Sequence, residues 1–370
     1  SFSFGPMKSS LLGLRRFAAM AGLRIGCHPD WLPDHKGWGP GYLLRQEFDE
    51  LVSNEFHWSV LQPEGPGKWD WSRADNAVRA ARDLGLPLRG HAILWYQMIP
   101  EWFAGLPVKE REKALVEHVR ALVGRYSDRI FSWDVINEPL WLPDKHRAGL
   151  RKDLLFETFG DRYFDIAFQT ASETAPGAEL VLNEALLVHR RHAPQRDKFH
   201  ALLEMLLGRG VPVHTAGVQA HIAWDDGLPM GDLDPAGTAG LLEAIGELNL
   251  SNRITELDVF DARLPASVAD RDAAVASLYG EFLDGVLGAD SLRGITIWGC
   301  SDASSWYNTY VRRVMPERLP HPEWRSRPLL FDAMLQPKAA YFAFVQSLRK
   351  AGLVNGEEQK ATGASLLLPV

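Results

Sequence analysis

The stretch FSWDVINEPLW, residues 131–141, shows most clearly how this chain folds. Its first half is rich in aromatic and β-branched residues, which predicts a buried strand. A proline directly after Glu138 cannot extend a strand ladder, so the strand should end there. The pair Asn137 and Glu138 is therefore expected at the C-terminal end of a strand, with an amide beside a carboxylate.

Outward from this stretch, short apolar runs alternate with longer amphipathic segments. Eight runs are predicted as strands: Leu23–His28, His57–Leu61, Leu86–Leu94, Phe131–Ile136, Glu179–Asn183, His214–Ala220, Arg253–Leu257 and Gly294–Trp298. Helices are predicted between them: Ala77–Leu84, Lys109–Tyr126, Tyr163–Thr174, Gln195–Gly208, Gly237–Leu248 and Arg271–Leu287. This alternation favours an α/β fold of the (β/α)8 TIM barrel type. An open doubly wound sheet would need a glycine fingerprint after the first strand, and IGCHPDW (25–31) lacks one.

No linker divides the chain, so we expect one catalytic domain over residues 8–350. Residues 1–7, SFSFGPM, look like a remnant of cloning, and LLGLRRFAAMAGLRIG (11–26) is predicted to include a helix that enters the fold. A helix over Phe331–Arg349 should close the barrel. The polar residues 351–370 are expected to form a flexible tail.

Composition narrows the possible partners. A formal net charge of -7 and a pI near 6.0 give no support for a nucleic-acid partner. No apolar run approaches a membrane span. Two cysteines, Cys27 and Cys300, cannot form a disulfide framework, and we expect two buried free thiols. The protein is expected to be a monomer without metal or cofactor, secreted or periplasmic if a signal peptide was removed and otherwise cytoplasmic.

Polar and aromatic residues follow the predicted strands. In this barrel class the active site lies at the C-terminal ends of the strands. Those positions hold His28, Trp58, His91, Trp95, Asn137, Glu138, Asn183, Glu184, Gln219, His221, Glu256, Asp258, Trp298 and Asp302. Amides, carboxylates and indoles around one mouth are typical of a sugar-binding site.

Two glutamates stand at the ends of strands that face each other across a barrel. Glu138 follows the fourth strand, and Glu256 in RITELDV (253–259) ends the seventh. Opposed carboxylates without metal-ligand spacing indicate glycoside hydrolysis, and their environments should then push their pKa values apart. The alternative is a pair of rim glutamates held in salt bridges. His221 and Asp258 are within geometric reach of Glu256, and a Glu–His–Asp cluster would keep Glu256 ionised and oriented.

Together these motifs resemble glycoside hydrolase family 10, the retaining endo-β-1,4-xylanases. The matching segments span almost the whole barrel: RGHAILW (89–95), WDVINEP (133–139), GVQAHI (217–222), ITELDV (254–259), ITIWGCSDASSW (295–306) and LLFD (329–332). The resemblance implies that Glu138 is the acid/base, that Glu256 is the nucleophile and that the substrate is a β-1,4-linked polysaccharide or oligosaccharide, with xylan favoured. It also implies a sugar cleft lined by Asn54, His91, Trp95, Asn137, Gln219, His221, Trp298 and Trp306. Another β-linked glycan, including an acidic one, and an inert glycan-binding barrel are the alternatives.

Two segments depart from the family pattern on the side that binds the non-reducing end. Where the family usually has Glu-Asn-x-x-Lys-Trp, this chain has SNEFHW (53–58), so Ser53 and His57 replace the Glu and the Lys. Where it usually has Trp-His-Ser-Gln-x-Pro, this chain has WYQMIP (95–100). These changes indicate an altered or shortened glycone side, unless His57 does what the lysine does elsewhere.

A third departure follows the eighth strand. The segment YNTYVRRVMPERLPHPEWRSR (307–327) contains five Arg and two Glu where the family has a short loop. We expect it to fold over the subsites near strands two and three, with Arg312 and Arg313 contacting an acidic sugar. The alternative is a solvated loop whose arginines pair with neighbouring acids.

Overall fold

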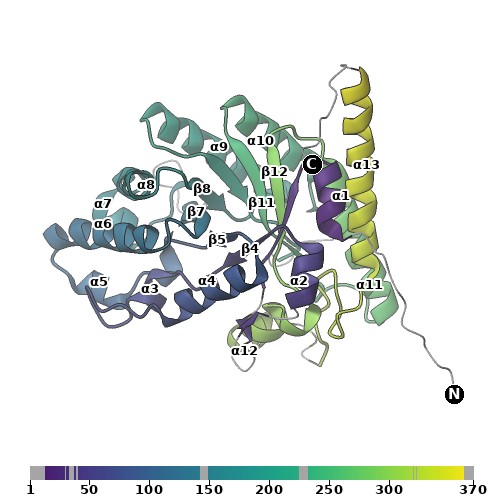
Figure 1. The fold of residues 1–370 in the computed structure, drawn as a ribbon, viewed down its shortest axis with the longest axis horizontal. Coiled ribbons are helices and arrows are strands. Elements are labelled where there is room, and N and C mark those ends of the chain that lie inside the picture. The colour runs from purple at the N-terminus through teal and green to yellow at the C-terminus, as the bar shows by residue number, and fades with distance from the viewer. Residues whose placement is uncertain are drawn as a thin grey trace.

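The computed structural model describes residues 13–29, 31–32, 37–38, 41–141, 149–224, 232–319, 321 and 323–361. Eight parallel strands form a closed ring in which β1 pairs with both β12 and β4, and β9 pairs with β11 (Figure 1). In order these strands are β1 (Arg24–Cys27), β4 (Glu50–Ser53), β5 (Leu88–Gly90), β7 (Ile130–Asn137), β8 (Glu179–Glu184), β9 (Thr215–Val218), β11 (Ser251–Val259) and β12 (Leu292–Ile297). The (β/α)8 TIM barrel predicted from the sequence is confirmed.

Short strands extend this ring at its C-terminal end. β6 (Leu94–Trp95) pairs with β7, and β10 (His221–Ile222) pairs with β11. The predicted strand Leu86–Leu94 is therefore two shorter pieces, whereas His214–Ala220 contains β9 alone and β10 begins directly after it. After β1, the strands β2 (Trp31–Leu32) and β3 (Gly37–Trp38) form a small antiparallel pair.

Helices cover the outside of the barrel. They are α1 (Leu14–Met20), α2 (Gly41–Glu47), α3 (Trp58–Leu61), α4 (Ser72–Leu84), α5 (Glu101–Gly105), α6 (Val108–Arg125), α7 (Leu154–Phe159), α8 (Arg162–Thr174), α9 (Ala193–Gly208), α10 (Pro235–Glu247), α11 (Val268–Val286), α12 (Arg312–Val314) and α13 (Ala339–Ala361). Local chemistry sets several boundaries: Asp234 caps α10 by accepting from Gly237 N at 3.1 Å, and Gly85, at φ 68°, ends α4. The helix expected to enter the fold is α1, and α13 packs against α1 and α11 (Figure 1).

The N-terminal half of the barrel interior is polar. Arg253 Nη1 donates to Glu50 Oε1 at 2.7 Å, and Arg253 Nε donates to Glu179 Oε2 at 3.0 Å. One strand layer nearer the active site, Arg89 Nη2 donates to Asp134 Oδ1 at 2.9 Å. The Arg253–Glu50 pair joins β11 and β4, which are not neighbours in the ring, whereas Arg89 and Asp134 lie on the neighbouring strands β5 and β7.

Three predicted elements differ in the structure. The second strand is Glu50–Ser53 and not His57–Leu61, because Glu50 points into this polar interior and hides the apolar pattern that is typical of a strand. The segment WSVL instead forms α3, and Trp58, expected at the mouth of the barrel, is buried against Phe103 and His118. The closing helix begins at Ala339, since Phe331 and Pro337 form an antiparallel bridge, and it continues to Ala361 through half of the expected tail.

Cys27 and Cys300 are buried free thiols, as predicted. Within the described ranges, no helix combines the length and apolar character that a bilayer crossing requires.

Candidate active site

Glu138 is presented by a sharp exit from β7. Its backbone adopts the left-handed conformation, with φ 55°, and its N–H donates to Asn183 O at 2.9 Å. Arg151 Nε donates to the Glu138 carbonyl at 3.0 Å. A non-glycine residue held in this region costs about 1–3 kcal/mol, and such strain concentrates at functional sites. The strand therefore ends at Glu138, as predicted, and the half-buried carboxylate stands at the mouth of the barrel.

Glu256 lies within β11 and is almost completely buried. Its Oε1 accepts from Asn183 Nδ2 at 2.8 Å, and its Oε2 lies 3.0 Å from His221 Nε2. Burial alone would raise the pKa of Glu256, but the hydrogen bond from His221 and the charges of His91 and His221 lower it. Glu256 is therefore ionised at neutral pH, which suits a nucleophile.

His221 and Asp258 form the predicted cluster with Glu256. His221 Nδ1 lies 2.8 Å from Asp258 Oδ1, and Asp258 also accepts from Trp306 Nε1 at 2.7 Å and Tyr307 Oη at 2.8 Å. Burial would lower the pKa of His221, but the charges and hydrogen bonds of Asp258 and Glu256 raise it to about 10. His221 is thus a cation that donates from both ring nitrogens, one to each carboxylate.

A chain of side-chain amides joins the two glutamates. Asn183 Nδ2 donates to Asn137 Oδ1 at 2.8 Å as well as to Glu256, and Gln219 Nε2 donates to Asn137 Oδ1 at 3.1 Å and to Glu138 Oε1 at 3.2 Å. Gly217 makes room for this chain, because a Cβ there would lie 2.3 Å from Asn183 Oδ1. Asn137 and Gln219 therefore lie at the site, as the sequence indicated.

Imidazole and indole rings wall the side of strands one to three. His57 lies 5.5 Å from His91 and 5.3 Å from Trp95 between ring centroids, and His91 lies 5.3 Å from Trp298. His28 stacks on Trp298 at 4.2 Å. The sequence-predicted residues His57, His91, Trp95 and Trp298 are thus brought together.

These histidines differ in charge. Burial, aided by the charge of His91, lowers the pKa of His28 to about 4 and that of His57 well below its usual value. Burial would also lower the pKa of His91, but Asp134, whose Oδ2 lies 2.8 Å from His91 Nδ1, and the charge of Glu256 raise it. Asn54 is exposed at the end of β4, and its side chain hydrogen-bonds to His28. At neutral pH, His28 and His57 are therefore uncharged.

The described part of the insertion packs on the side of strands six and seven, not over strands two and three as expected. Tyr307, Val311 and Leu319 form an apolar cluster with Phe260 and Ala262, and Trp224 packs against it. Because Tyr307 and Trp306 both donate to Asp258, the insertion braces the Glu256 cluster.

The arginines of the insertion bond mainly to the protein. Arg312 donates to the Trp324 carbonyl, Arg318 lies over the Trp224 ring at 4.5 Å, and Arg327 binds Asp272 through two 2.7 Å hydrogen bonds. Arg313 is exposed on α12. The pairing with a neighbouring acid that the alternative predicted is seen at Arg327, and the contact of Arg312 and Arg313 with an acidic sugar stays a prediction.

Several residues that shape the site have no role predicted from the sequence. Asn183 links the glutamates, and Asp134 orients His91. Glu184 Oε2 accepts from Leu140 N at 2.9 Å, and its burial with the charge of Glu138 raises its pKa to about 8. Their common signal is a polar residue in or directly after an apolar strand.

Within the part of the chain that the structure describes, no group of three or more His, Cys, Asp and Glu side chains is arranged to hold a metal ion. The chemistry available is that of two carboxylates, one ionised and cradled by a cation, joined by amides at the C-terminal end of a barrel. Fold and site together define a glycoside hydrolase of the TIM-barrel class.

The chain belongs to glycosyl hydrolase family 10, whose profile matches residues 32–347. Members hydrolyse O-glycosidic bonds with retention of configuration. A β-1,4-xylanase of Dictyoglomus thermophilum is 28% identical over 315 residues, covering 82% of this chain and 83% of that protein. Endo-1,4-β-xylanase 3 of Hypocrea jecorina is 27% identical over 298 residues, covering 80% and 74%. The crystal structure of native xylanase 10B from Thermotoga maritima has a TM-score of 0.75 at 25% identity, covering 92% of this chain and 99% of that one.

Proposed function

We propose that this protein is an endo-β-1,4-xylanase-type hydrolase in which Glu256 is the nucleophile and Glu138 the acid/base. The observation that carries the assignment is the unequal treatment of the two carboxylates. Glu256 accepts hydrogen bonds from Asn183 and from cationic His221, whereas the partners of Glu138 among the described residues are neutral amides. A carboxylate held ionised suits attack, and a less constrained one suits proton transfer.

The reaction then runs in two displacements. A Glu256 oxygen forms a bond to the anomeric carbon as the glycosidic C–O bond breaks, and Glu138 gives its proton to the departing oxygen. Water next attacks the same carbon from the side the leaving group vacated, Glu138 takes the water's proton, and the Glu256 ester bond breaks. The two carboxyl groups should be about 5–5.5 Å apart for this retaining route.

Xylan is the favoured substrate because the relatives that this chain matches over most of their length are named xylanases. The neutral His28 and His57, with Trp95 and Trp298, form a wall suited to an uncharged sugar at the glycone side. The products formed from defined β-1,4-xylo-oligosaccharides will show whether cleavage is endo or exo and how many subsites bind the substrate.

The test of the roles compares two leaving groups. Glu256→Ala should abolish turnover of both an activated aryl β-xylobioside and unmodified xylan, because no other group forms the glycosyl-enzyme. Glu138→Ala should spare the activated substrate far more, since a good leaving group needs little protonation. Equal losses on both substrates in Glu138→Ala would mean that the roles are misassigned, and full binding of xylan without hydrolysis by the wild type would favour the inert barrel.

A further inference from the structure

A cavity of about 550 Å³ lies beside the catalytic cleft at the same end of the barrel. It is enclosed by the N-terminal turn of α11, the loop after β12 and the end of the insertion, where Arg271, Asn308, Trp324, Arg325 and Arg327 line it. These segments follow the C-terminal ends of β11 and β12. Glu256 lies in β11, and Trp298 directly follows β12. The neighbouring residue of Asn308, Tyr307, is fully buried against Asp258. Glu138, Glu256 and His221 are not among the residues that line the cavity, so it is distinct from the cleft.

Arg271 is the unusual residue of this cavity. It is only 4% exposed, and its buried Nε has no hydrogen-bond partner among the described residues. Its Nε lies 3.4 Å from Asp261 Oδ2, an ion-pair distance, and its guanidinium lies 4.8 Å from the Trp324 ring centre. A buried guanidinium carries five donors, and leaving them unused is costly. Its donors at the cavity wall are available to an acceptor that enters the cavity.

Further positive charge surrounds this group. Arg325 is exposed at the cavity and forms no ion pair with any residue in the described ranges. Arg327 is fixed at the rim by its two hydrogen bonds to Asp272. The single acid of the lining, Asp302, is matched by Lys338 Nζ at 2.9 Å. The positive end of the α11 dipole adds to the field, because Val268 begins that helix and lines the cavity.

We propose that this cavity binds the carboxylate of an acidic sugar, such as a uronate unit of a β-linked glycan. The forked guanidinium geometry of Arg271 and Arg325 suits a carboxylate, which can accept two parallel hydrogen bonds. The volume exceeds that of a small inorganic anion, and Ala266, Val268, Ala303 and Ala333 supply apolar wall for the rest of a ligand. The choice of a sugar rests on the proposed function, whereas the choice of an anion rests on the cavity alone.

The test measures binding directly, in the full-length Glu256→Ala variant so that no substrate is consumed. D-Glucuronate, D-glucose and inorganic phosphate are titrated while the side-chain NMR signals of Trp324 Nε1 and the arginine Nε groups are followed. Glucuronate should shift the signals of Trp324 and Arg271, and glucose should not. Losing one charge-assisted contact should weaken binding about tenfold in Arg325→Gln. Arg271→Lys is the second variant, since it keeps a cation beside Asp261.

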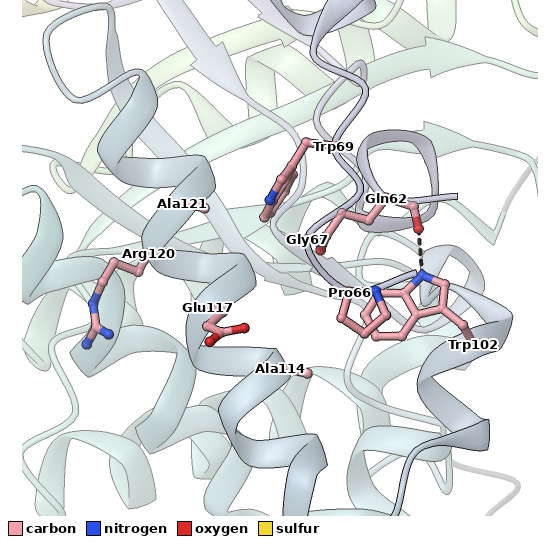
Figure 2. Close-up of a pocket in the computed structure, with 9 residues that line it drawn as sticks. All are labelled: Gln62, Pro66, Gly67, Trp69, Trp102, Ala114, Glu117, Arg120 and Ala121. Atoms are coloured by element: carbon pink, nitrogen blue, oxygen red, sulfur yellow. Dashed lines mark hydrogen bonds between the residues drawn. The ribbon is translucent and has the colours of Figure 1, made fainter. Parts of the chain in front are cut away.

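The matched control is Arg120→Gln. Arg120 is also an exposed arginine at a cavity, the one of about 290 Å³ between α6 and the segment that follows α3, where Trp102 Nε1 donates to Gln62 O at 2.6 Å (Figure 2). Its replacement should leave glucuronate binding unchanged.

The outcomes separate the two proposals. Hydrolysis of xylan by the wild type without glucuronate binding overturns the cavity assignment and leaves the function standing. Glucuronate binding without any glycosidase activity overturns the proposed function and leaves the assignment of an anion-binding cavity standing. Equal binding of phosphate and glucuronate at these signals means a general oxyanion site and overturns the sugar assignment.

Discussion

Asn183 is the residue through which the two glutamates are joined. Its amide donates 2.8 Å hydrogen bonds to both Asn137 and Glu256, and its Oδ1 accepts from Thr255 Oγ1 at 2.7 Å. With all its polar atoms used and no exposed surface, it holds Glu256, the proposed nucleophile, at a fixed angle to Glu138, the proposed acid/base. Catalytic groups need such placement, because small misalignments lower the rate steeply.

Replacing Asn183 by Asp tests this role without changing its size. A second carboxylate beside Glu256 disfavours ionisation, so the pKa of Glu256 should rise. The acid limb of the kcat/KM profile should then move to higher pH, with a lower plateau, while circular dichroism shows an intact fold. An unchanged acid limb would mean that Asn183 does not act on Glu256.

His221 should make stability depend on alkaline pH. Its folded pKa of about 10 lies above its ordinary value of 6.5, so its contribution is complete below pH 6.5 and is lost as pH rises to 10. Urea unfolding across this range should show a falling free energy of unfolding, and His221→Asn should flatten the fall. Equal slopes in both proteins would show that His221 is not the titrating group.

At the scale of elements, the polar barrel interior explains where prediction from sequence succeeded. The fourth and seventh strands were recognised because WDVIN and ITELDV are mostly apolar runs, and the catalytic residues follow from their ends. The second strand was not, because Glu50 points inward to ion pairs with Arg24 and Arg253 that no local pattern discloses. Asn183 was located at a strand end, but its bonds to residues 46 and 73 positions away depend on the closed barrel.

The ion pairs of Glu50 give a matched test. Arg253→Met removes the buried cation that pairs with both Glu50 and Glu179, and should cost about 3–5 kcal/mol of unfolding free energy. Arg24→Met removes a cation that is 46% exposed and 3.2 Å from the same Glu50, and should cost no more than about 1 kcal/mol. Denaturant titration measures both. Similar losses would mean that burial does not set the strength of this network.

At the scale of the whole molecule, α13 joins the two ends of the described chain. It packs on α1 and α11, and Tyr341 Oη donates to Glu47 Oε2 at 3.1 Å, the same oxygen that accepts from Leu14 N at 2.8 Å. The insertion also packs on segments distant in the sequence, since Tyr307 and Val311 contact the cluster that contains Phe260. Neither arrangement could be predicted from the sequence, since both depend on which surfaces the closed barrel leaves for them.

Replacing two phenylalanines of α13 tests how much the packing of this helix contributes to the free energy of unfolding. Phe344 is fully buried and Phe342 is 53% exposed, although both lie on the same helix. Phe344→Ala should lower the free energy of unfolding by about 3–5 kcal/mol, because it leaves a cavity in the core. Phe342→Ala should change it by no more than about 0.5 kcal/mol. A small effect of Phe344→Ala would mean that α13 is not part of the cooperative fold.

The central claim, that Glu256 attacks the sugar, is tested most directly by trapping the glycosyl-enzyme. An activated 2-deoxy-2-fluoro-β-xylobioside slows the second displacement, so the covalent intermediate accumulates and its peptide can be sequenced by mass spectrometry. We expect the added mass of one 2-deoxy-2-fluoroxylobiosyl group, carried by the peptide at Glu256 and absent in Glu256→Ala. Label on Glu138 or on another carboxylate, or steady turnover with no label, would contradict it.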